Sequence, residues 1–118
     1  MKWLIILLTL TNALLACDAV ELIGNNVKYQ VCSTKSDNEF FYYSKDCKEV
    51  NKCVDFKQID KLKLFPNQSP LFSLCYQLKG TPLFTKHQKT KKTVEICLFD
   101  NRPIGLNYLM SHYQIYRK

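Results

Sequence analysis

The stretch SPLFSLCYQLKG, residues 69 to 80, has the features of a complete helix. Ser69 can cap the first turn with its side chain, Pro70 suits the first helical position, and Gly80 follows the end. Apolar residues recur here at the spacing of one helix face, which predicts that this face packs on a core. They are Leu71, Leu74, Cys75 and Leu78.

Two strand-forming runs follow this helix, TPLFTK at 81–86 and TVEICLF at 93–99, and a basic loop joins them. Because strand residues alternate between faces, the second run has two different sides. One side carries Val94, Ile96 and Leu98, and the other carries Glu95, Cys97 and Phe99. If the Cys97 side packs on the helix, Cys97 can form a disulfide with Cys75. If the other side does, the bond is excluded. We favour the Cys75–Cys97 pair.

The remaining segments complete an α+β order. VKYQV at 27–31 alternates and EFFYYS at 39–44 is aromatic, so the two predict a hairpin. CVDFKQIDKLKLF at 53–65 begins as a short strand and is otherwise ambiguous. DNRP at 100–103 predicts a turn, and IGLNYLMSHYQIY at 104–116 predicts a closing helix. We therefore predict a small, disulfide-stabilised α+β domain with an antiparallel sheet of two hairpins and two helices.

Residues 1–16, MKWLIILLTLTNALLA, have the anatomy of a secretory signal: a basic start, an uncharged apolar run and a small residue at the end. The run is shorter than the roughly 20 apolar residues that a membrane-spanning helix needs. We predict that residues 1–16 are a signal peptide, that residues 17–26 form a tether, and that residues 27–118 form the folded domain.

Cys17 decides how the exported protein is held. The sequence LLAC, residues 14 to 17, resembles a bacterial lipobox, in which the cysteine sulfur is joined to diacylglycerol and the chain is cut before it. This predicts lipid attachment at Cys17 and a membrane anchor. Two alternatives stay open: cleavage after Ala19, which removes Cys17, or retention of Cys17 as a disulfide partner.

Five cysteines follow Cys17, and behind an export signal they indicate disulfides formed in an oxidising compartment. They are Cys32, Cys47, Cys53, Cys75 and Cys97. Cys32 can pair with Cys47 or with Cys53. If Cys17 is lipidated one of the others stays free, and if it is a thiol all six can pair. Since no two cysteines have the spacing of zinc ligands, we expect no metal and no cofactor.

The chain is basic, with a formal net charge of +7, and this favours anionic partners. The positive residues are densest in KHQKTKK, 86–92, which is either a candidate anion-binding loop or an ordinary solvated hairpin tip. The candidate residues are Lys86, His87, Lys89, Lys91 and Lys92. There is no pattern for reading bases, so no nucleic acid is expected. His87 and His112 lack the sequence context of a nuclease, and no nucleophile motif occurs, so we expect no catalytic residues.

Residues 74–110, LCYQLKGTPLF to VEICLFDNRPIGLNYLM, resemble a short domain of unknown function in small exported bacterial proteins. Some of these are lipoproteins, and some carry a putative-hemolysin label. The shared pattern is a cysteine, a glycine, a strand, a variable loop, a second strand with a cysteine, a polar turn and a closing helix. This chain has one glycine, Gly80, where a pair is usual, and no tryptophan or cysteine in the closing helix. The resemblance implies an exported, envelope-associated bacterial protein and no particular chemistry.

We therefore predict a non-enzymatic lipoprotein of the cell envelope, in the bacterial periplasm or anchored to a membrane. Its expected partners are the membrane, through the lipid, and an anionic lipid, a polysaccharide or an envelope protein. The alternative is an extracellular, freely secreted, disulfide-rich effector or inhibitor that is cleaved after Ala19.

Overall fold

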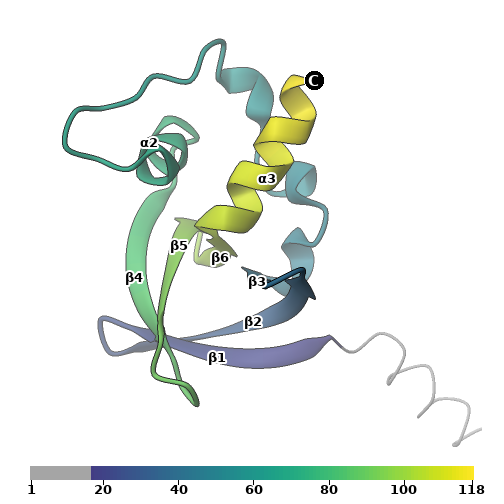
Figure 1. Cartoon of the computed structure of the whole chain (residues 1–118), viewed down its shortest axis with the longest axis vertical. Coiled ribbons are helices and arrows are strands. Elements are labelled where there is room, and N and C mark those ends of the chain that lie inside the picture. The colour runs from purple at the N-terminus through teal and green to yellow at the C-terminus, as the bar shows by residue number, and fades with distance from the viewer. Residues whose placement is uncertain (1–16) are drawn as a thin grey trace, which may run out of the picture.

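Six antiparallel strands close into a barrel in the computed structural model, which describes residues 17–118 (Figure 1). The order around the barrel is β1-β2-β3-β6-β5-β4. The strands are β1 (Asp18–Gly24), β2 (Val27–Ser36), β3 (Glu39–Tyr43), β4 (Thr81–His87), β5 (Thr93–Phe99) and β6 (Arg102–Gly105). The sheet is antiparallel, as predicted, but it is a closed barrel and not two hairpins. The predicted signal peptide, 1–16, lies outside the described residues.

Two α-helices, α2 (Pro70–Gln77) and α3 (Leu106–Arg117), lie on the side of the molecule away from the β1–β2 hairpin (Figure 1). Ser69 caps α2, because its Oγ accepts a hydrogen bond from the N–H of Phe72 at 3.2 Å. The segment 53–65 was predicted to begin with a short strand, but no strand forms there. Between β3 and α2 the chain instead forms three short 3₁₀ helices, of which only the last lies in that segment. They are η1 (Lys45–Cys47), η2 (Val50–Lys52) and η3 (Phe56–Gln58).

Two tight turns account for the strands that the sequence analysis missed. Asn25 and Asn26 have φ angles of 50° and 64°, and Asp100 and Asn101 have φ angles of 51° and 65°. Two consecutive left-handed residues are the signature of a two-residue hairpin turn. The segment 17–26, predicted as a tether, therefore forms β1 and its turn. The predicted turn at 100–103 is only two residues long, and the chain continues as β6 before α3 begins.

Few contacts close the barrel. β3 meets β6 at one residue pair, and β1 meets β4 at two. These pairs are Tyr43–Ile104, Leu22–His87 and Ile23–Lys86. β4 pairs with β1 only at Leu22 and Ile23, in the second half of β1. The first half of β1 therefore pairs with β2 on one side and with no strand of the barrel on the other. The barrel wall is open along this half of β1.

The core has two parts, and β5 separates them. Inside the barrel, Leu22, Val31 and Ile96 are buried. On the outer side, Cys97 is fully buried in a larger cluster formed by the helices, the 3₁₀ segments and the barrel wall. Because side chains alternate along a strand, β5 contributes to both parts.

All six cysteines are paired: Cys17–Cys32, Cys47–Cys53 and Cys75–Cys97. The last bond joins α2 to β5 and is the pair that the sequence favoured. Three disulfides indicate a non-cytoplasmic compartment. No helix within residues 17–118 has the length and hydropathy needed to cross a membrane.

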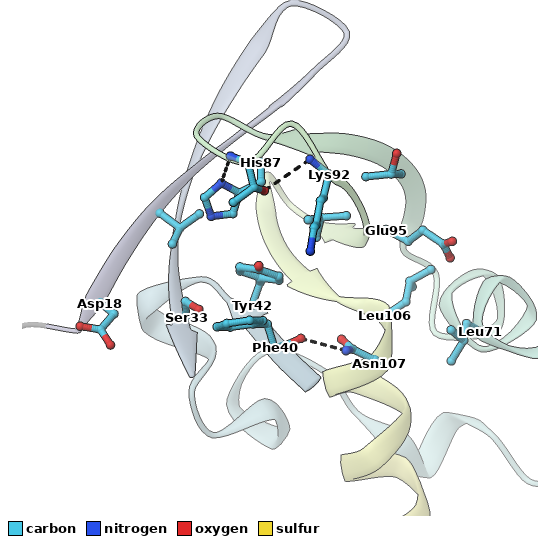
Figure 2. Close-up of a pocket in the computed structure, with 14 residues that line it drawn as sticks. Asp18, Ser33, Phe40, Tyr42, Leu71, His87, Lys92, Glu95, Leu106 and Asn107 are labelled. Carbon is cyan, nitrogen blue, oxygen red and sulfur yellow. Dashed lines mark hydrogen bonds between the residues drawn. The ribbon is translucent and has the colours of Figure 1, made fainter. Parts of the chain in front are cut away.

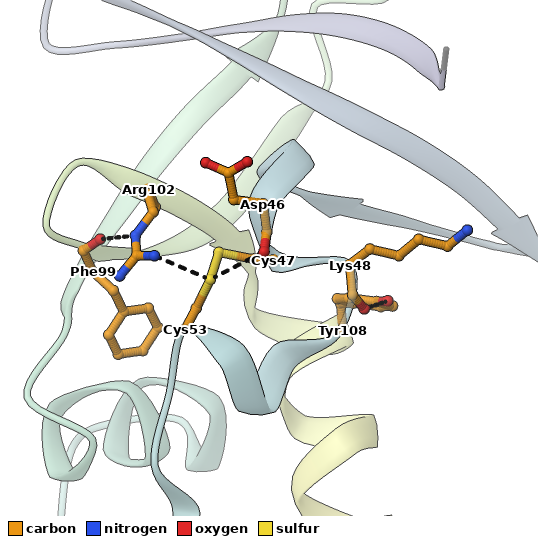
Figure 3. The surroundings of a disulfide bond; sticks show 7 residues. All are labelled: Asp46, Cys47, Lys48, Cys53, Phe99, Arg102 and Tyr108. Carbon is orange, nitrogen blue, oxygen red and sulfur yellow. Dashed lines mark hydrogen bonds between the residues drawn. A yellow bond between two sulfur atoms is a disulfide. The ribbon is translucent and has the colours of Figure 1, made fainter. Parts of the chain in front are cut away.

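The Cys47–Cys53 bond is held against β6 and α3 (Figure 3). The Arg102 guanidinium lies 3.4 Å from the Cys53 sulfur and donates a second hydrogen bond to the carbonyl of Phe99. Nearby, the Tyr108 hydroxyl donates to the carbonyl of Lys48 at 2.6 Å. Burial raises the pKa of Tyr108, and so does the neighbouring Tyr43. The short 3₁₀ segment is thus fixed by one covalent bond and by side chains from β6 and α3.

Candidate binding site

A cavity of about 580 Å³ lies at one end of the barrel (Figure 2). In this antiparallel order, β1, β3 and β5 begin at the same end at which β2, β4 and β6 finish. Residues from these strand ends line the cavity, together with the first residues of α3 and the β4–β5 loop. They include Asp18 and Ser33 beside the open stretch of β1, and Leu106 and Asn107 on the opposite side.

Two aromatic side chains on β3 form one wall of the cavity. Phe40 and Tyr42 are two residues apart, so they share a face of the strand, and their rings are stacked with centroids 6.5 Å apart. Half of the Phe40 side chain is exposed to solvent. The Tyr42 ring lies edge-on to the His87 ring, with centroids 6.2 Å apart. Burial raises the pKa of Tyr42, so its hydroxyl stays neutral at neutral pH.

The β4–β5 loop sets His87 and Lys92 side by side above this wall (Figure 2). The His87 N–H donates to the Lys92 carbonyl, and the Lys91 N–H donates to the His87 carbonyl, both at 2.8 Å. The Nδ1 atom of His87 accepts from the N–H groups of Lys89 and Thr90, at 3.2 and 3.3 Å. Since Nδ1 is an acceptor, the proton of the neutral ring belongs on Nε2. The histidine therefore braces the loop and keeps one N–H donor free.

Lys92 is the cation that reaches into the cavity. Its side chain extends from the loop towards Tyr42, whereas the carboxylates of Asp18 and Glu95 lie at opposite edges (Figure 2). Within residues 17–118, Lys92 forms no ion pair. The centre of the cavity can therefore take a negative charge, and its two edges repel one.

The structure divides the predicted anion-binding loop. Lys92 lines the cavity of Figure 2, Lys89 lines a smaller one, of about 440 Å³, and His87 lines both. Lys86 and Lys91 line neither of these cavities. The sequence analysis missed several residues of the cavity. These are Asp18, Ser33, Phe40, Tyr42, Glu95 and Asn107.

The start of β1 is fastened beside the cavity, because the disulfide between Cys17 and Cys32 directly precedes Asp18. One sulfur atom cannot carry both a disulfide and a thioether to diacylglycerol. The predicted lipid attachment at Cys17 is therefore incompatible with this bond. Cleavage after Ala19 would also remove one partner of the bond.

His112 lies apart from the cavity, on α3, with its ring 4.5 Å from that of Tyr108. Burial lowers the pKa of His112 and favours its neutral form. The fold therefore does not combine the two histidines in one site. In the part of the chain that the structure describes, no three histidine, cysteine or acidic side chains are grouped so that they could hold a metal ion.

No protein-family model, curated protein or solved structure matches this chain. The resemblance of residues 74–110 to a small exported bacterial domain stays a prediction. Function therefore has to follow from the chemistry of the cavity.

Proposed function

We propose that this is an exported, non-enzymatic binding protein whose barrel cavity holds a small ligand with one anionic group and a flat apolar part. The observation that carries the proposal is the position of Lys92, a cation without an ion pair among residues 17–118, above the stacked rings of Phe40 and Tyr42. The cavity, of about 580 Å³, falls within the range of about 300–1,000 Å³ that is usual for small-molecule sites.

The polar groups favour one compact negative charge. The Lys92 ammonium extends into the cavity and is a donor to a carboxylate, sulfonate or phosphate, and His87 lines the cavity beside it. A ligand with a second, distant anionic group would meet Asp18 or Glu95 at an edge and would be repelled. The aromatic wall suits a planar apolar group, because stacked rings offer a flat surface for contact.

The hydroxyl groups around the cavity support binding and not catalysis. A nucleophilic serine or threonine needs a base within hydrogen-bond distance. In the described chain, the hydrogen bonds to the His87 ring come from backbone N–H groups, and none comes from Ser33, Thr90 or Thr93. To act as a general base through Nδ1, His87 would have to lose its hydrogen bonds from the N–H groups of Lys89 and Thr90.

Export is supported by the three disulfides and by the signal-like residues 1–16. We propose that the chain is cut directly before Cys17 and that Cys17 is kept as a disulfide partner. Loss of Cys17 would leave Cys32 without its partner beside the cavity. We therefore propose a freely secreted protein that keeps Cys17, in place of one that is anchored by a lipid on Cys17.

The mass of the mature protein tests this processing. Expressed with its own leader in a bacterial host and purified without reductant, it should have the mass of residues 17–118 less six hydrogen atoms, two for each disulfide. Reduction should restore those six. Added acyl chains would show that the lipobox is used, and a chain beginning at residue 20 would show that Cys17 is discarded. Either result would contradict the proposal.

Anilinonaphthalene sulfonate, a planar aromatic anion, is a direct probe of the cavity. We expect saturable binding with a rise in fluorescence, and roughly fivefold weaker binding for Lys92→Ala, since a partly exposed ion pair contributes up to about 1 kcal/mol. Phe40→Ser should weaken binding by a similar factor through the lost ring contact. The matched controls are Lys91→Ala and Leu64→Ser, which change exposed residues that do not line this cavity. Unchanged binding by Lys92→Ala would refute the proposed site.

A further inference from the structure

A second surface, outside the cavity, combines exposed apolar side chains with lysines. It extends over the loop that precedes α2, the outer side of α2 and the outer face of β4. Of its side chains, Leu64 is 65% exposed, Phe84 59% and Tyr76 46%. We call this surface the apolar face. Its members are Leu64, Phe65, Phe72, Tyr76 and Phe84.

Hydrogen bonds from α2 hold the loop in place. The N–H of Phe65 donates to Ser73 Oγ at 3.2 Å, and the N–H of Lys63 donates to Gln77 Oε1 at 3.1 Å. Ser73 and Gln77 are four residues apart and so lie on one side of the helix. The loop backbone is thereby fixed, and Leu64 is left in solvent between two anchored residues. Figure 1 shows this loop projecting from the body of the protein before it enters α2.

Helical spacing connects the loop to the barrel wall. Tyr76 lies three residues after Ser73, and so beside the point where the loop is attached. Phe72 lies four residues before Tyr76 on the same stripe of α2, and its ring packs on that of Phe84, with centroids 5.3 Å apart. Half-buried Phe72 therefore connects the exposed apolar groups of the loop and α2 with Phe84 on β4.

Lysines surround this surface. Lys61 and Lys63 precede Leu64 in the loop, and Lys79 directly follows the end of α2, after its C-cap Leu78. Lys86 lies two residues after Phe84, on the same outer face of β4. None of the four lysines forms an ion pair within the part of the chain that the structure describes.

Two carboxylates are near the same region. Asp60 lies at the start of the loop, and Glu95 is the cross-strand partner of Phe84. The lysines outnumber these carboxylates, so the charge around the apolar face is positive.

We propose that the apolar face docks on the surface of an anionic lipid bilayer. Leu64 and Phe65 would enter the boundary between headgroups and acyl chains, and the lysines would meet the phosphate groups. Exposed apolar side chains within a basic surround are the two elements that interfacial membrane binding combines. This association needs no lipid on Cys17 and does not use the cavity.

Cosedimentation with vesicles tests the proposal, using the disulfide-bonded protein. The wild type should pellet with vesicles of phosphatidylcholine and phosphatidylglycerol and stay in solution with phosphatidylcholine alone. Leu64→Ser with Phe65→Ser should lower the partition coefficient by roughly tenfold or more, because two apolar insertions are lost. The matched control is Ile115→Ser on α3, whose side chain is 67% exposed and which should bind as the wild type does.

Charge reversal separates this surface from the net charge of the protein. Lys61→Glu with Lys63→Glu should weaken binding by about tenfold or more, since each lysine contributes roughly fivefold near an anionic surface. Lys89→Glu with Lys91→Glu changes the net charge equally in the β4–β5 loop, and it should have a much smaller effect. Thermal unfolding of each variant controls for loss of the fold.

Three results would overturn the proposal. The wild type could fail to bind anionic vesicles, or the two charge reversals could weaken binding equally. The third is a dimer of the wild type in analytical ultracentrifugation that Leu64→Ser with Phe65→Ser dissociates, because the occupant would then be a second copy of the chain. Lys92→Ala should partition as the wild type does, so failure of the ligand proposal and failure of this one are distinguishable.

Discussion

Replacing Cys75 with serine should lower the free energy of unfolding by about 3 kcal/mol or more, since a disulfide that closes a loop of this length contributes about that amount. Cys75 and Cys97 are 22 residues apart, and both are fully buried between α2 and β5. The loss is a large share of the roughly 5–15 kcal/mol that stabilises a small domain. Urea unfolding without reductant measures it.

The double variant is the control for this prediction. Cys75→Ser with Cys97→Ser should be little less stable than Cys75→Ser alone, because the covalent link is already lost in the single variant. A single variant within about 1 kcal/mol of the wild type would show that the bond contributes little. Peptide mapping that joins Cys75 to another cysteine would contradict the pairing itself.

Gly80→Ala should destabilise the protein by about 3 kcal/mol or more, because overpacking of a closed site costs about 1–3 kcal/mol and here has little room for relief. A Cβ atom at residue 80 would overlap the Cys97 sulfur and lie 2.8 Å from Cε1 of Phe99. The sulfur is bonded to Cys75 and cannot turn away. Calorimetry or urea unfolding will detect the loss, and Thr81→Ala at the exposed neighbouring position should have a small effect.

A double-mutant cycle identifies the cause of the Gly80 effect. In a Cys75→Ala, Cys97→Ala background the overlap with the sulfur is removed and only the close approach to the Phe99 ring remains, so Gly80→Ala should cost less than in the wild type. An equal cost in both backgrounds would mean that the glycine is needed for a reason other than its contact with the bridge.

The second half of the chain could be predicted because its signals are local. Ser69 and Pro70 mark the start of α2, and β5 alternates clearly. From the sequence, we expected only one of the two faces of β5 to pack on the helix. In the fold both faces are buried, because Cys97 faces the helix and Ile96 faces the barrel interior. In a closed barrel the inner side of each strand is covered by the other strands, so both sides of β5 can be buried with a helix on only one of them.

The first strand and the closure of the barrel were harder to infer. The pairs Asn25–Asn26 and Asp100–Asn101 are local turn signals that could have indicated β1 and β6. The closure itself depends on three residue pairs between strands that are distant in sequence, and no local pattern specifies such pairs.

The cavity was only partly predictable for the same reason. His87 and Lys92 were predicted through the charge of their loop, and the alternation of Phe40 and Tyr42 in an aromatic strand was a signal that went unused. Asp18 and Asn107 come from opposite ends of the chain. Only the fold brings them to one cavity.

The bond between Cys17 and Cys32 would couple the proposed ligand binding to the redox state of the surroundings. The first half of β1 is an edge strand with one strand neighbour, and chain ends of this kind fray unless they are tied down. The covalent bond keeps this edge in place, so a ligand does not have to order the cavity rim and bear that entropic cost. In a reducing compartment the Cys17–Cys32 bond would be lost, so we expect the proposed ligand site to reach its full affinity only where disulfides form.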